Sequence, residues 1–350
     1  MTHGAAGLAP IEVLVAGMST GSGGGQDVYE RDLIAALSRS TELRLGADRV
    51  GLSARTIARR AMSGRLLRFS RVLRRPLGPF TWDHRVVHRL DLRLPPGRVD
   101  IVTIHDVAPM LFSDEARIPA TVWQEARRAD AVITATQFAA EEIRRVLGLA
   151  APIVIPHGVP SDVHDSLPLD TAGLRQLGIT APYVLQVGGG TRRKNLPLLR
   201  EAWLASDARR DGVMLVSCGP MRAGRQSQLG GGGSGVLILD VLPRNVVLRL
   251  MRSASAVVVP SIYEGFGLPL VEAMAMGTPV VAARTPSAVE VCGDAAILVD
   301  PDPDSLAAGI DRALSVRDTV ARETMKARSR LFTWERAASS HAEIYRGFVK

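Results

Sequence analysis

Cysteine, long apolar runs and an export signal are scarce or missing in this 350-residue sequence. Its two cysteines, Cys218 and Cys292, lie in apolar segments, so a disulfide-stapled secreted scaffold is excluded and buried free thiols in a reducing compartment are expected. The longest apolar runs fall far short of the roughly 20 residues that a membrane-spanning helix needs. The first residues show neither the basic nor the apolar segment of an export signal. We therefore expect a cytoplasmic protein.

Lysine and aromatic residues are also scarce. Only Lys194, Lys326 and Lys350 are lysines, so 40 of the 43 basic residues are arginine, an excess that a coding bias alone can produce. The formal net charge is +8, and residues 49–98 contain 13 arginines but only two acids. Such a basic patch suits the phosphates of nucleic acid, an anionic membrane or a lipid-linked substrate. Aromatic residues make up only 4% and no recognition motif is visible, so we expect no nucleic-acid partner.

The remaining composition is that of a globular protein of two domains, with 46% apolar and 22% charged residues. Short β-branched runs alternate with helical patterns along nearly the whole chain, which is typical of parallel sheets with crossover helices. The rhythm breaks at residues 156–170, where Pro, Asp, Ser and His cluster. We therefore predict an α/β fold with two Rossmann-like domains facing each other across a cleft. Their predicted bounds are 1–165 and 166–332, with a last helix over 333–350 completing the first domain.

The expected elements follow this rhythm. Strands are predicted at 12–16, 44–46, 101–104, 131–134, 153–155, 183–187, 213–217, 236–239, 256–259, 279–282 and 296–299. Helices are predicted at 27–39, 116–128, 137–147, 196–205, 245–252, 268–276, 304–315 and 333–345.

A glycine-rich turn follows the first predicted strand and includes Gly24 and Gly25. Glycines let a ligand approach the backbone, and the N-terminus of the following helix favours an anion. The spacing fits neither a dinucleotide-binding fingerprint nor a P-loop. The turn is therefore a candidate ligand-binding loop, and a loop without a function is the alternative.

A second turn, residues 187–195, lies between a strand and a helix of the second half and carries Arg192, Arg193 and Lys194 beside three glycines. Amide donors, the helix dipole and a fork-shaped guanidinium all favour an anion at such a place. This turn is a candidate phosphate-binding site, and a solvated basic turn is the alternative.

The strongest pattern is PSIYEGFGLPLVEAMAMGTP at residues 260–279. A buried strand ends there, two glycines open a loop, and Pro269 begins a helix where its missing N–H costs little. Glu264 lies in the loop and Glu272 just inside the helix. Acids beside free amides suit a ligand that offers hydroxyls and a diphosphate together. The alternative, that Glu272 only caps the helix, is disfavoured because its apolar and small neighbours offer it no other partner.

These features together resemble glycosyltransferase family 4, whose members are retaining, nucleotide-sugar-dependent enzymes with the GT-B fold. The resemblance rests on the two glutamates with seven residues between them, the Arg-Lys-Asn turn and the segment SIYEGFGLPLVEAMAMGTPVV. It covers nearly the whole chain, because further matches follow in the expected order: the glycine loop at 21–25, TIHD at 103–106, IPHGV at 155–159 and FTWER at 332–336. The TIHD form resembles the mannosyltransferase-like branch that acts on bacterial glycans.

The resemblance implies a nucleotide-sugar site in the second domain. Glu272 would hydrogen-bond the ribose hydroxyls of the donor. Glu264 and the backbone at Phe266 and Gly267 would hold the transferred sugar, while amides near Leu268 would face the diphosphate.

The family pattern also implies a cationic grip on the leaving diphosphate by Arg193 and Lys194. Relatives often carry arginine in the place that Gly189 occupies, so the cationic load would rest on the Arg192–Lys194 turn. We expect Gly189 to line the donor site.

The acceptor side follows from the first domain. His105, at the end of a strand, would touch the sugar across the cleft and act as a catalytic residue together with Glu264, Arg193 and Lys194. Asp106, Gly24 and Gly25 would line the cleft where acceptor and donor meet.

The resemblance implies a hexosyltransferase that needs no metal and no cofactor besides its nucleotide-sugar substrate. Mannose is the first candidate for the sugar and GDP-mannose for the donor, with UDP-sugars next; the acceptor is a glycan, a lipid-linked molecule or a small molecule. The acidic turn at 300–304 is better explained as a helix cap than as a metal site. Two other classes stay open: a non-catalytic nucleotide-sugar-binding protein and a basic nucleic-acid-binding protein.

The arginine-rich stretch from Arg55 to Arg75 is interleaved with apolar residues, as in a basic helix that lies on an anionic membrane. We expect it to hold the protein at the periphery of the inner membrane face, near lipid-linked acceptors. A phosphorylated acceptor or a solvated helix explains the same pattern.

Overall fold

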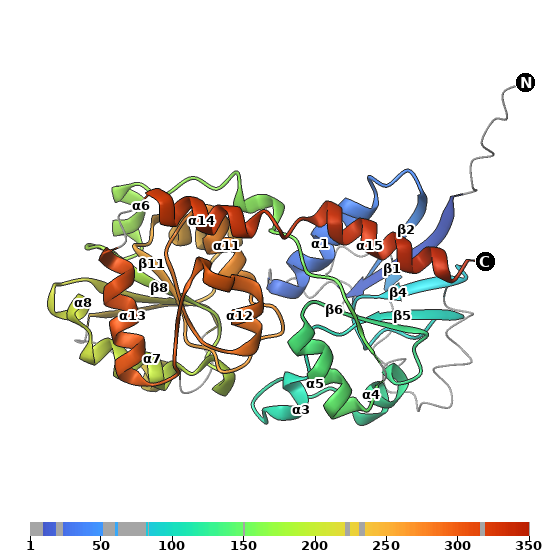
Figure 1. Cartoon of the computed structure of the whole chain (residues 1–350), viewed down its shortest axis with the longest axis horizontal. Coiled ribbons are helices and arrows are strands. Elements are labelled where there is room, and N and C mark those ends of the chain that lie inside the picture. Colours follow the sequence, from blue (N-terminus) through green and yellow to red (C-terminus); the bar gives the residue numbers. More distant parts are fainter. Residues whose placement is uncertain are drawn as a thin grey trace, which may run out of the picture.

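The computed structural model of the chain describes residues 10–18, 24–51, 60–61, 82, 84–149, 151–220, 225–230, 235–315 and 319–349. Two parallel β-sheets, each with helices around it, form the two halves of an elongated molecule (Figure 1). The predicted α/β fold with two Rossmann-like sheets is therefore confirmed. The proposed domain boundary at 165/166 stays a prediction; the connection between the sheets runs from Val154 to Tyr183.

The first sheet, within the described residues, contains seven strands in the order β3-β2-β1-β4-β5-β6-β7, all parallel. Its strands are β1 (Ile11–Met18), β2 (Leu43–Gly51), β3 (Arg60–Ala61), β4 (Val86–Arg89), β5 (Val99–Thr103), β6 (Ala131–Thr134) and β7 (Ile153–Val154). The order reverses between β1 and β4. In such sheets ligands bind outside the carboxyl ends of the strands at the reversal.

The second sheet, counted over the same described residues, contains six parallel strands in the order β10-β9-β8-β11-β12-β13. They are β8 (Tyr183–Val187), β9 (Met214–Cys218), β10 (Val236–Leu239), β11 (Ala256–Val259), β12 (Val280–Ala283) and β13 (Ile297–Val299). Here the order reverses between β8 and β11. The basic turn follows β8 and the loop of Glu264 follows β11, so both candidate segments leave the sheet at its reversal.

The helices lie on both faces of the sheets and along the junction. They are α1 (Gly25–Leu37), α3 (Ala108–Leu111), α4 (Ala120–Ala126), α5 (Gln137–Leu147), α6 (Thr171–Gln176), α7 (Leu196–Ala205), α8 (Asp207–Arg210), α9 (Arg225–Leu229), α10 (Arg244–Ser253), α11 (Leu268–Met276), α12 (Pro286–Cys292), α13 (Pro303–Ser315), α14 (Thr319–Ser329) and α15 (Trp334–Gly347). In the part of the chain that the structure describes, no helix is long and apolar enough to cross a bilayer.

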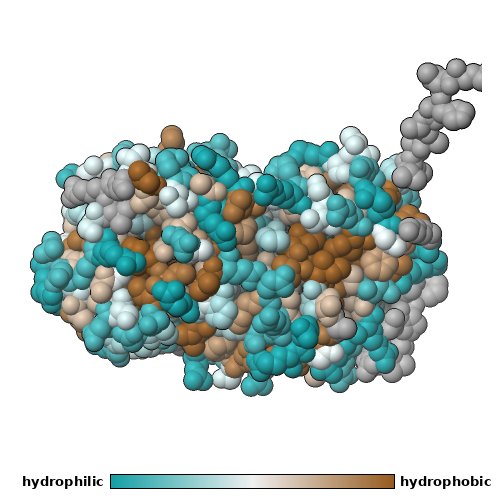
Figure 2. Space-filling view, in the orientation of Figure 1, coloured by the Kyte–Doolittle hydropathy of each residue, from teal (hydrophilic) through white to brown (hydrophobic). Residues whose placement is uncertain are grey.

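The C-terminal helices join the two halves. Figure 1 shows α14 beside the second sheet and α15 beside the first, and α14 packs against α11 while α15 packs against α1 and β1. Trp334 and Tyr345 of α15 are buried in the core that also contains Val13 and Leu33. Figure 2 shows hydrophilic side chains over most of the same face, with apolar ones gathered over the middle of each half.

The pattern of the sequence did not predict β4, which lies next to β1 in the middle of the first sheet. Two of its four residues are His88 and Arg89, and both are fully buried. Arg89 donates from Nε and from a terminal nitrogen to the carboxylate of Asp100 at 2.7 and 2.6 Å. A buried arginine is tolerated only with such a partner. Arg89 therefore does not belong to the solvent-facing basic patch that its sequence position suggested.

The arginine-rich stretch itself, Arg55–Arg75, lies outside the described residues apart from the backbone of 60–61. The described residues 60–61 form β3, which pairs with β2. Among the described arginines nearby, Arg93 is paired with Asp91 at 2.6 Å. Membrane contact through this stretch stays a prediction.

Candidate active site

The N-termini of α1 and α11 meet between the two sheets. A β-carbon added to Gly25, the first residue of α1, would lie 3.3 Å from Cδ1 of Leu268, the first residue of α11. Gly24 caps α1 with an extended backbone, and no side chain caps α11. The structure thus brings together the glycine loop predicted to line the cleft and the helix predicted to face the diphosphate. Both helix N-termini favour an anion there.

Glu264 holds the two cations predicted to act beside it. Its Oε1 accepts a hydrogen bond from Nζ of Lys194 at 2.5 Å, and its Oε2 accepts one from Arg193 at 2.9 Å. Glu264 is only 9% exposed. Burial alone would raise the pKa of this carboxyl, but the charges of Lys194 and Arg193 outweigh it and lower the pKa to about 2. Glu264 is therefore ionised at neutral pH and can accept hydrogen bonds from a ligand's hydroxyls.

The basic turn also contacts acids of the first half. Arg193 donates from Nε to Glu115 at 2.6 Å, and the backbone N–H of Arg192 donates to Asp114 at 2.6 Å. Asp114 and Glu115 follow α3, which belongs to the half that contains the first sheet. Neither acid was a predicted site residue, because nothing in the local sequence pattern separates them from ordinary surface carboxylates.

His105 follows β5 and lies against aromatic rings. Its ring centroid is 4.7 Å from that of Tyr29, in an edge-on arrangement, and 5.4 Å from that of His157. Its Nε2 is buried and has no hydrogen-bond partner among the described residues. Burial lowers the pKa of His105 to about 4, although the charge of Asp91 opposes the shift. A neutral imidazole with an unused ring nitrogen can take part in a hydrogen bond with a ligand.

Asp106 and Gly265 form a close contact between the halves. A β-carbon on Gly265 would collide with the backbone oxygen of His105 and lie 3.1 Å from Cβ of Asp106. Only glycine therefore allows the loop of Glu264 to approach the end of β5 so closely. Asp106 accepts a hydrogen bond from the N–H of Ala108 at 2.9 Å, and its pKa is raised by burial against the opposing charge of Arg193.

Glu272 is buried, at 3% exposure, and forms an ion pair with Arg244 at 2.8 Å. The expectation that its neighbours offer it no partner is wrong. Arg244 begins α10, 28 residues earlier in the chain, so no local pattern reveals the pairing. Burial raises the pKa of Glu272, and Arg244 counteracts the rise. The hydrogen-bonding role of Glu272 toward a ribose stays a prediction.

Phe266, Gly267 and Gly189 occupy different environments. The ring of Phe266 is buried and lies 4.9 Å from that of His157, so only its backbone is available to a ligand. Gly267 caps α11 with a φ of +85°, a left-handed conformation that favours glycine. A β-carbon on Gly189 would meet nothing within 4 Å, so this residue borders open space. The three positions frame the N-terminus of α11 and the basic turn.

Within the described ranges, no three His, Cys, Asp or Glu side chains lie close enough together to hold a metal ion. The prediction that no metal takes part remains untested by this observation.

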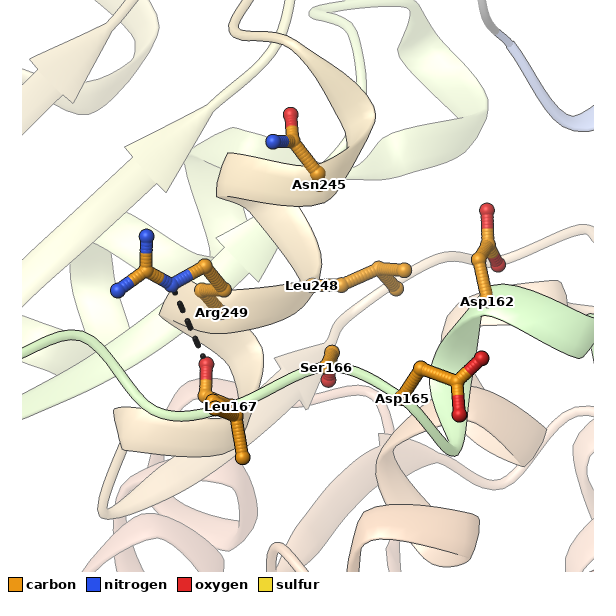
Figure 3. A pocket seen from close by; sticks show the side chains of 7 residues that line it. All are labelled: Asp162, Asp165, Ser166, Leu167, Asn245, Leu248 and Arg249. Atoms are coloured by element: carbon orange, nitrogen blue, oxygen red, sulfur yellow. Dashed lines mark hydrogen bonds between the residues drawn. The ribbon is translucent and has the colours of Figure 1, made fainter.

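One pocket of about 510 Å³ lies beside the site (Figure 3). It is formed where the connection after β7 runs along α10, and its lining residues are Asp162, Asp165, Ser166, Leu167, Asn245, Leu248 and Arg249. None of these is a predicted site residue, but Asp162 contacts Arg244, the partner of Glu272.

The chain is similar in sequence to known glycosyltransferases. Residues 175–331 match the family model described as "Glycosyl transferases group 1". A GDP-mannose-dependent alpha-(1-6)-phosphatidylinositol dimannoside mannosyltransferase of Mycobacterium tuberculosis is 30% identical over 221 residues, 60% of this chain and 56% of that protein. The O-antigen chain mannosyltransferase B of Escherichia coli is 38% identical over 113 residues, 31% of this chain and 30% of that protein. The chain therefore spans about half, or less, of the length of these curated relatives.

The fold has solved counterparts over nearly its full length. Sucrose-phosphate synthase from Thermosynechococcus elongatus superimposes with a TM-score of 0.72 at 22% identity, covering 96% of this chain and 99% of that one. The predicted GT-B fold is confirmed. The resemblance to glycosyltransferases, mannosyltransferases among them, is confirmed as well, since residues 175–331 match the group 1 model and two mannosyltransferases are similar to parts of the chain.

Proposed function

We propose that this protein is a retaining hexosyltransferase that moves a sugar from a nucleotide diphosphate to a glycan, lipid-linked or small-molecule acceptor. The observation that carries the proposal is Glu264, ionised and held by Lys194 and Arg193 at the end of β11. Eight residues further along, Glu272 lies on α11, whose uncapped N-terminus points toward α1. One ligand with hydroxyls and a diphosphate matches all these groups.

The diphosphate is assigned to the basic turn and the N-terminus of α11. Arg193 and Lys194 supply positive charge, and the first amides of α11 supply hydrogen-bond donors. Departure of the sugar leaves negative charge on the diphosphate. Fixed cations and amides aimed at that charge stabilise the transition state more than the bound substrate, and losing one such donor costs roughly 3–4 kcal/mol.

The transferred sugar is assigned to the space between Glu264 and His105. Glu264 accepts hydrogen bonds from its hydroxyls, and neutral His105 contributes its unused Nε2 from the other half of the molecule. Retention follows in the mechanism of the family when the departing phosphate takes the acceptor's proton on the same face of the sugar. The cations of the basic turn neutralise the leaving group, so this mechanism needs neither a protein nucleophile nor a metal.

The donor is assigned to GDP-mannose first and to UDP-sugars second. The names of two relatives support mannose, and one of them names GDP-mannose. The name of that relative also includes a phosphatidylinositol dimannoside, which supports a lipid-linked acceptor. We assign the membrane contact, at the inner membrane face, to the Arg55–Arg75 stretch.

A donor screen followed by a transfer assay tests the proposal. Thermal unfolding is measured with GDP, UDP, GDP-mannose and UDP-glucose, because a ligand at 100 times its Kd adds roughly 2.7 kcal/mol of stability. Release of the nucleoside diphosphate from the stabilising donor is then followed in EDTA with extracted lipids or glycans as acceptors. Stabilisation without any release indicates a non-catalytic binding protein. No stabilisation by any of the four, with salt-sensitive binding of DNA or RNA on filters, rejects the proposal in favour of a nucleic-acid binder.

A further inference from the structure

A row of alternating charges connects Glu272 to the first half of the molecule. Glu272 pairs with Arg244 at 2.8 Å, and Arg244 donates two hydrogen bonds to Asp162 at 2.8 and 2.9 Å. Asp162 accepts a further hydrogen bond from Arg31 at 2.9 Å, and Arg31 is bound in turn to Asp32 at 2.7 Å. The row starts on α11, passes through the first residue of α10 and the connection between the sheets, and ends on α1.

Arg244 is the member of this row that acts on the predicted ribose-binding carboxylate. Its side chain is 19% exposed and lies between two acids, so its guanidinium is fixed from both sides. It donates to Oε1 of Glu272. A carboxylate held at one oxygen presents a fixed hydrogen-bond acceptor. Without the arginine, a buried Glu272 would face Asp162 without compensation, and its charged form would be costly.

A second arginine on the same helix provides a contrast. Arg249 donates to the backbone oxygen of Leu167 at 3.3 Å and so also ties α10 to the connection between the sheets (Figure 3). Unlike Arg244, it donates to backbone oxygens, and within the described part of the chain it makes no hydrogen bond to the carboxylate of Glu272. A comparison of variants of the two arginines therefore distinguishes a general contact between α10 and the connection from a specific effect on Glu272.

We propose that Arg244 is a positioning residue, which aims the carboxylate of Glu272 at the ribose hydroxyls of the donor and fixes it to the connection between the two halves through Asp162. This inference rests on the proposed function, because it concerns the same donor site. Arg244 lies outside the motifs that predicted the site, and it would help to determine the preference for a nucleotide with ribose hydroxyls.

The test compares nucleotides with and without ribose hydroxyls. Affinities for GDP and 2′,3′-dideoxy-GDP, and for the matching uridine pair, are measured by calorimetry on the full chain. The preferred base is the one bound more tightly by the wild type. We expect the wild type to favour the hydroxylated form by about tenfold or more, since hydrogen bonds to a charged group contribute roughly 1.5–3 kcal/mol. Glu272→Gln should remove most of this preference.

The variants of Arg244 then isolate its role. Arg244→Met should reduce the preference by about as much as Glu272→Gln, and Arg244→Lys should keep part of it because the charge is retained. Arg249→Met is the control and should behave like the wild type. Asp162→Asn should lower the preference less than Arg244→Met. In the double variant Arg244→Met with Glu272→Gln, no loss beyond that of Glu272→Gln is expected.

Each other outcome overturns the inference. An unchanged preference in Arg244→Met, beside a lost one in Glu272→Gln, shows that Arg244 does not aim the carboxylate. An additional loss in the double variant shows that it acts elsewhere. Equal losses of ribose preference in Arg249→Met and Arg244→Met would show that Arg244 only helps to hold α10 against the connection between the sheets.

If melting curves show that Arg244→Met does not fold, Arg244→Lys and Asp162→Asn replace it in the test. An unchanged ribose preference in both of these variants then overturns the inference. A wild type that binds GDP or UDP without any ribose preference rejects the ribose assignment and this inference but not the diphosphate site, whereas binding of neither nucleotide rejects the proposed function itself.

Discussion

Arg193 donates to Glu115 at 2.6 Å across the junction between the two halves of the molecule. The same guanidinium holds Glu264 at 2.9 Å, so one cation joins an acid of the first half to an acid of the second. Glu290 adds a related contact, because it accepts hydrogen bonds from the first two backbone N–H groups of α5 in the first half. Contacts between the two halves therefore include a carboxylate that binds a cation of the candidate site and a carboxylate that accepts hydrogen bonds from the backbone of α5.

Glu115→Gln should strengthen nucleoside diphosphate binding by about threefold to tenfold, because the carboxylate competes with the diphosphate for Arg193. Calorimetry with GDP and GMP, or with UDP and UMP, measures the effect. The monophosphate should respond less. Glu142→Gln is the matched control, since Glu142 pairs with Arg145 on the same helix and not with the basic turn. Weaker diphosphate binding in Glu115→Gln would show that this acid supports the site and does not compete for it.

Glu264→Gln should lower the turnover of the preferred donor by about 100-fold or more, and should lower turnover more than donor affinity, because it removes the charged acceptor for the hydroxyls of the transferred sugar. Steady-state kinetics with the donor varied separate kcat from KM. Glu323→Gln, which alters an exposed ion pair with Lys326, should have wild-type rates. A Glu264→Gln variant with full turnover would remove this residue from the mechanism.

The pH dependence of turnover should show no histidine ionisation near pH 6.5 from His105. Burial lowers the pKa of His105 to about 4, so the ring is neutral through the range of the assay and gains a proton only in more acidic solution. Turnover measured from pH 5.5 to 8 in the wild type and in His105→Gln gives the comparison. Loss of activity in the variant, with no change in the shape of the profile, is expected. An inflection near pH 6.5 that disappears in the variant contradicts the neutral ring.

The stability of the folded chain should fall as the pH decreases from 6.5 toward 4. Burial lowers the pKa of His341 to about 4, so the unfolded chain takes up a proton in this range before the folded chain does. The stability that neutral His341 contributes is therefore complete above pH 6.5 and lost as the pH falls through the folded-state pKa. His341→Leu should flatten the curve by up to roughly 3 kcal/mol at pH 4.

Urea unfolding at several pH values measures this slope. His164→Leu is the control, because the side chain of His164 is exposed near the connection between the sheets. An equally steep curve in His341→Leu would show that other buried groups account for the acid sensitivity.

Much of the second half could be predicted from the sequence because its signals are local. The strand at Tyr183–Val187 and the helices Leu196–Ala205 and Leu268–Met276 were predicted with the observed bounds. Each is a strand or helix bounded by glycine, proline or polar residues, whose backbone preferences act over a few positions. The basic turn and Glu264, both predicted parts of the site, also lie together, since they follow neighbouring strands of one sheet.

The pairings that the sequence could not supply join residues far apart in the chain. Arg244 and Glu272 are 28 residues apart, and Glu115 and Arg193 are 78 apart. Such contacts depend on how loops and whole sheets are placed relative to one another, which no local pattern encodes. The strand containing Arg89 was not predicted for a related reason. Asp100 of the next strand neutralises the charge of Arg89 and allows it to be buried, but the sequence of the strand itself has the pattern of a polar segment.

The most direct measurement of the central claim is the affinity of the preferred nucleotide sugar for the wild type and for two variants of the site. GDP-mannose and UDP-glucose are titrated into the wild type, Lys194→Met and Glu272→Gln by calorimetry in EDTA. The account predicts that one donor binds the wild type and that each variant weakens it by about tenfold or more, because one loses a diphosphate contact and the other a ribose contact. Equal affinities in all three proteins would contradict it.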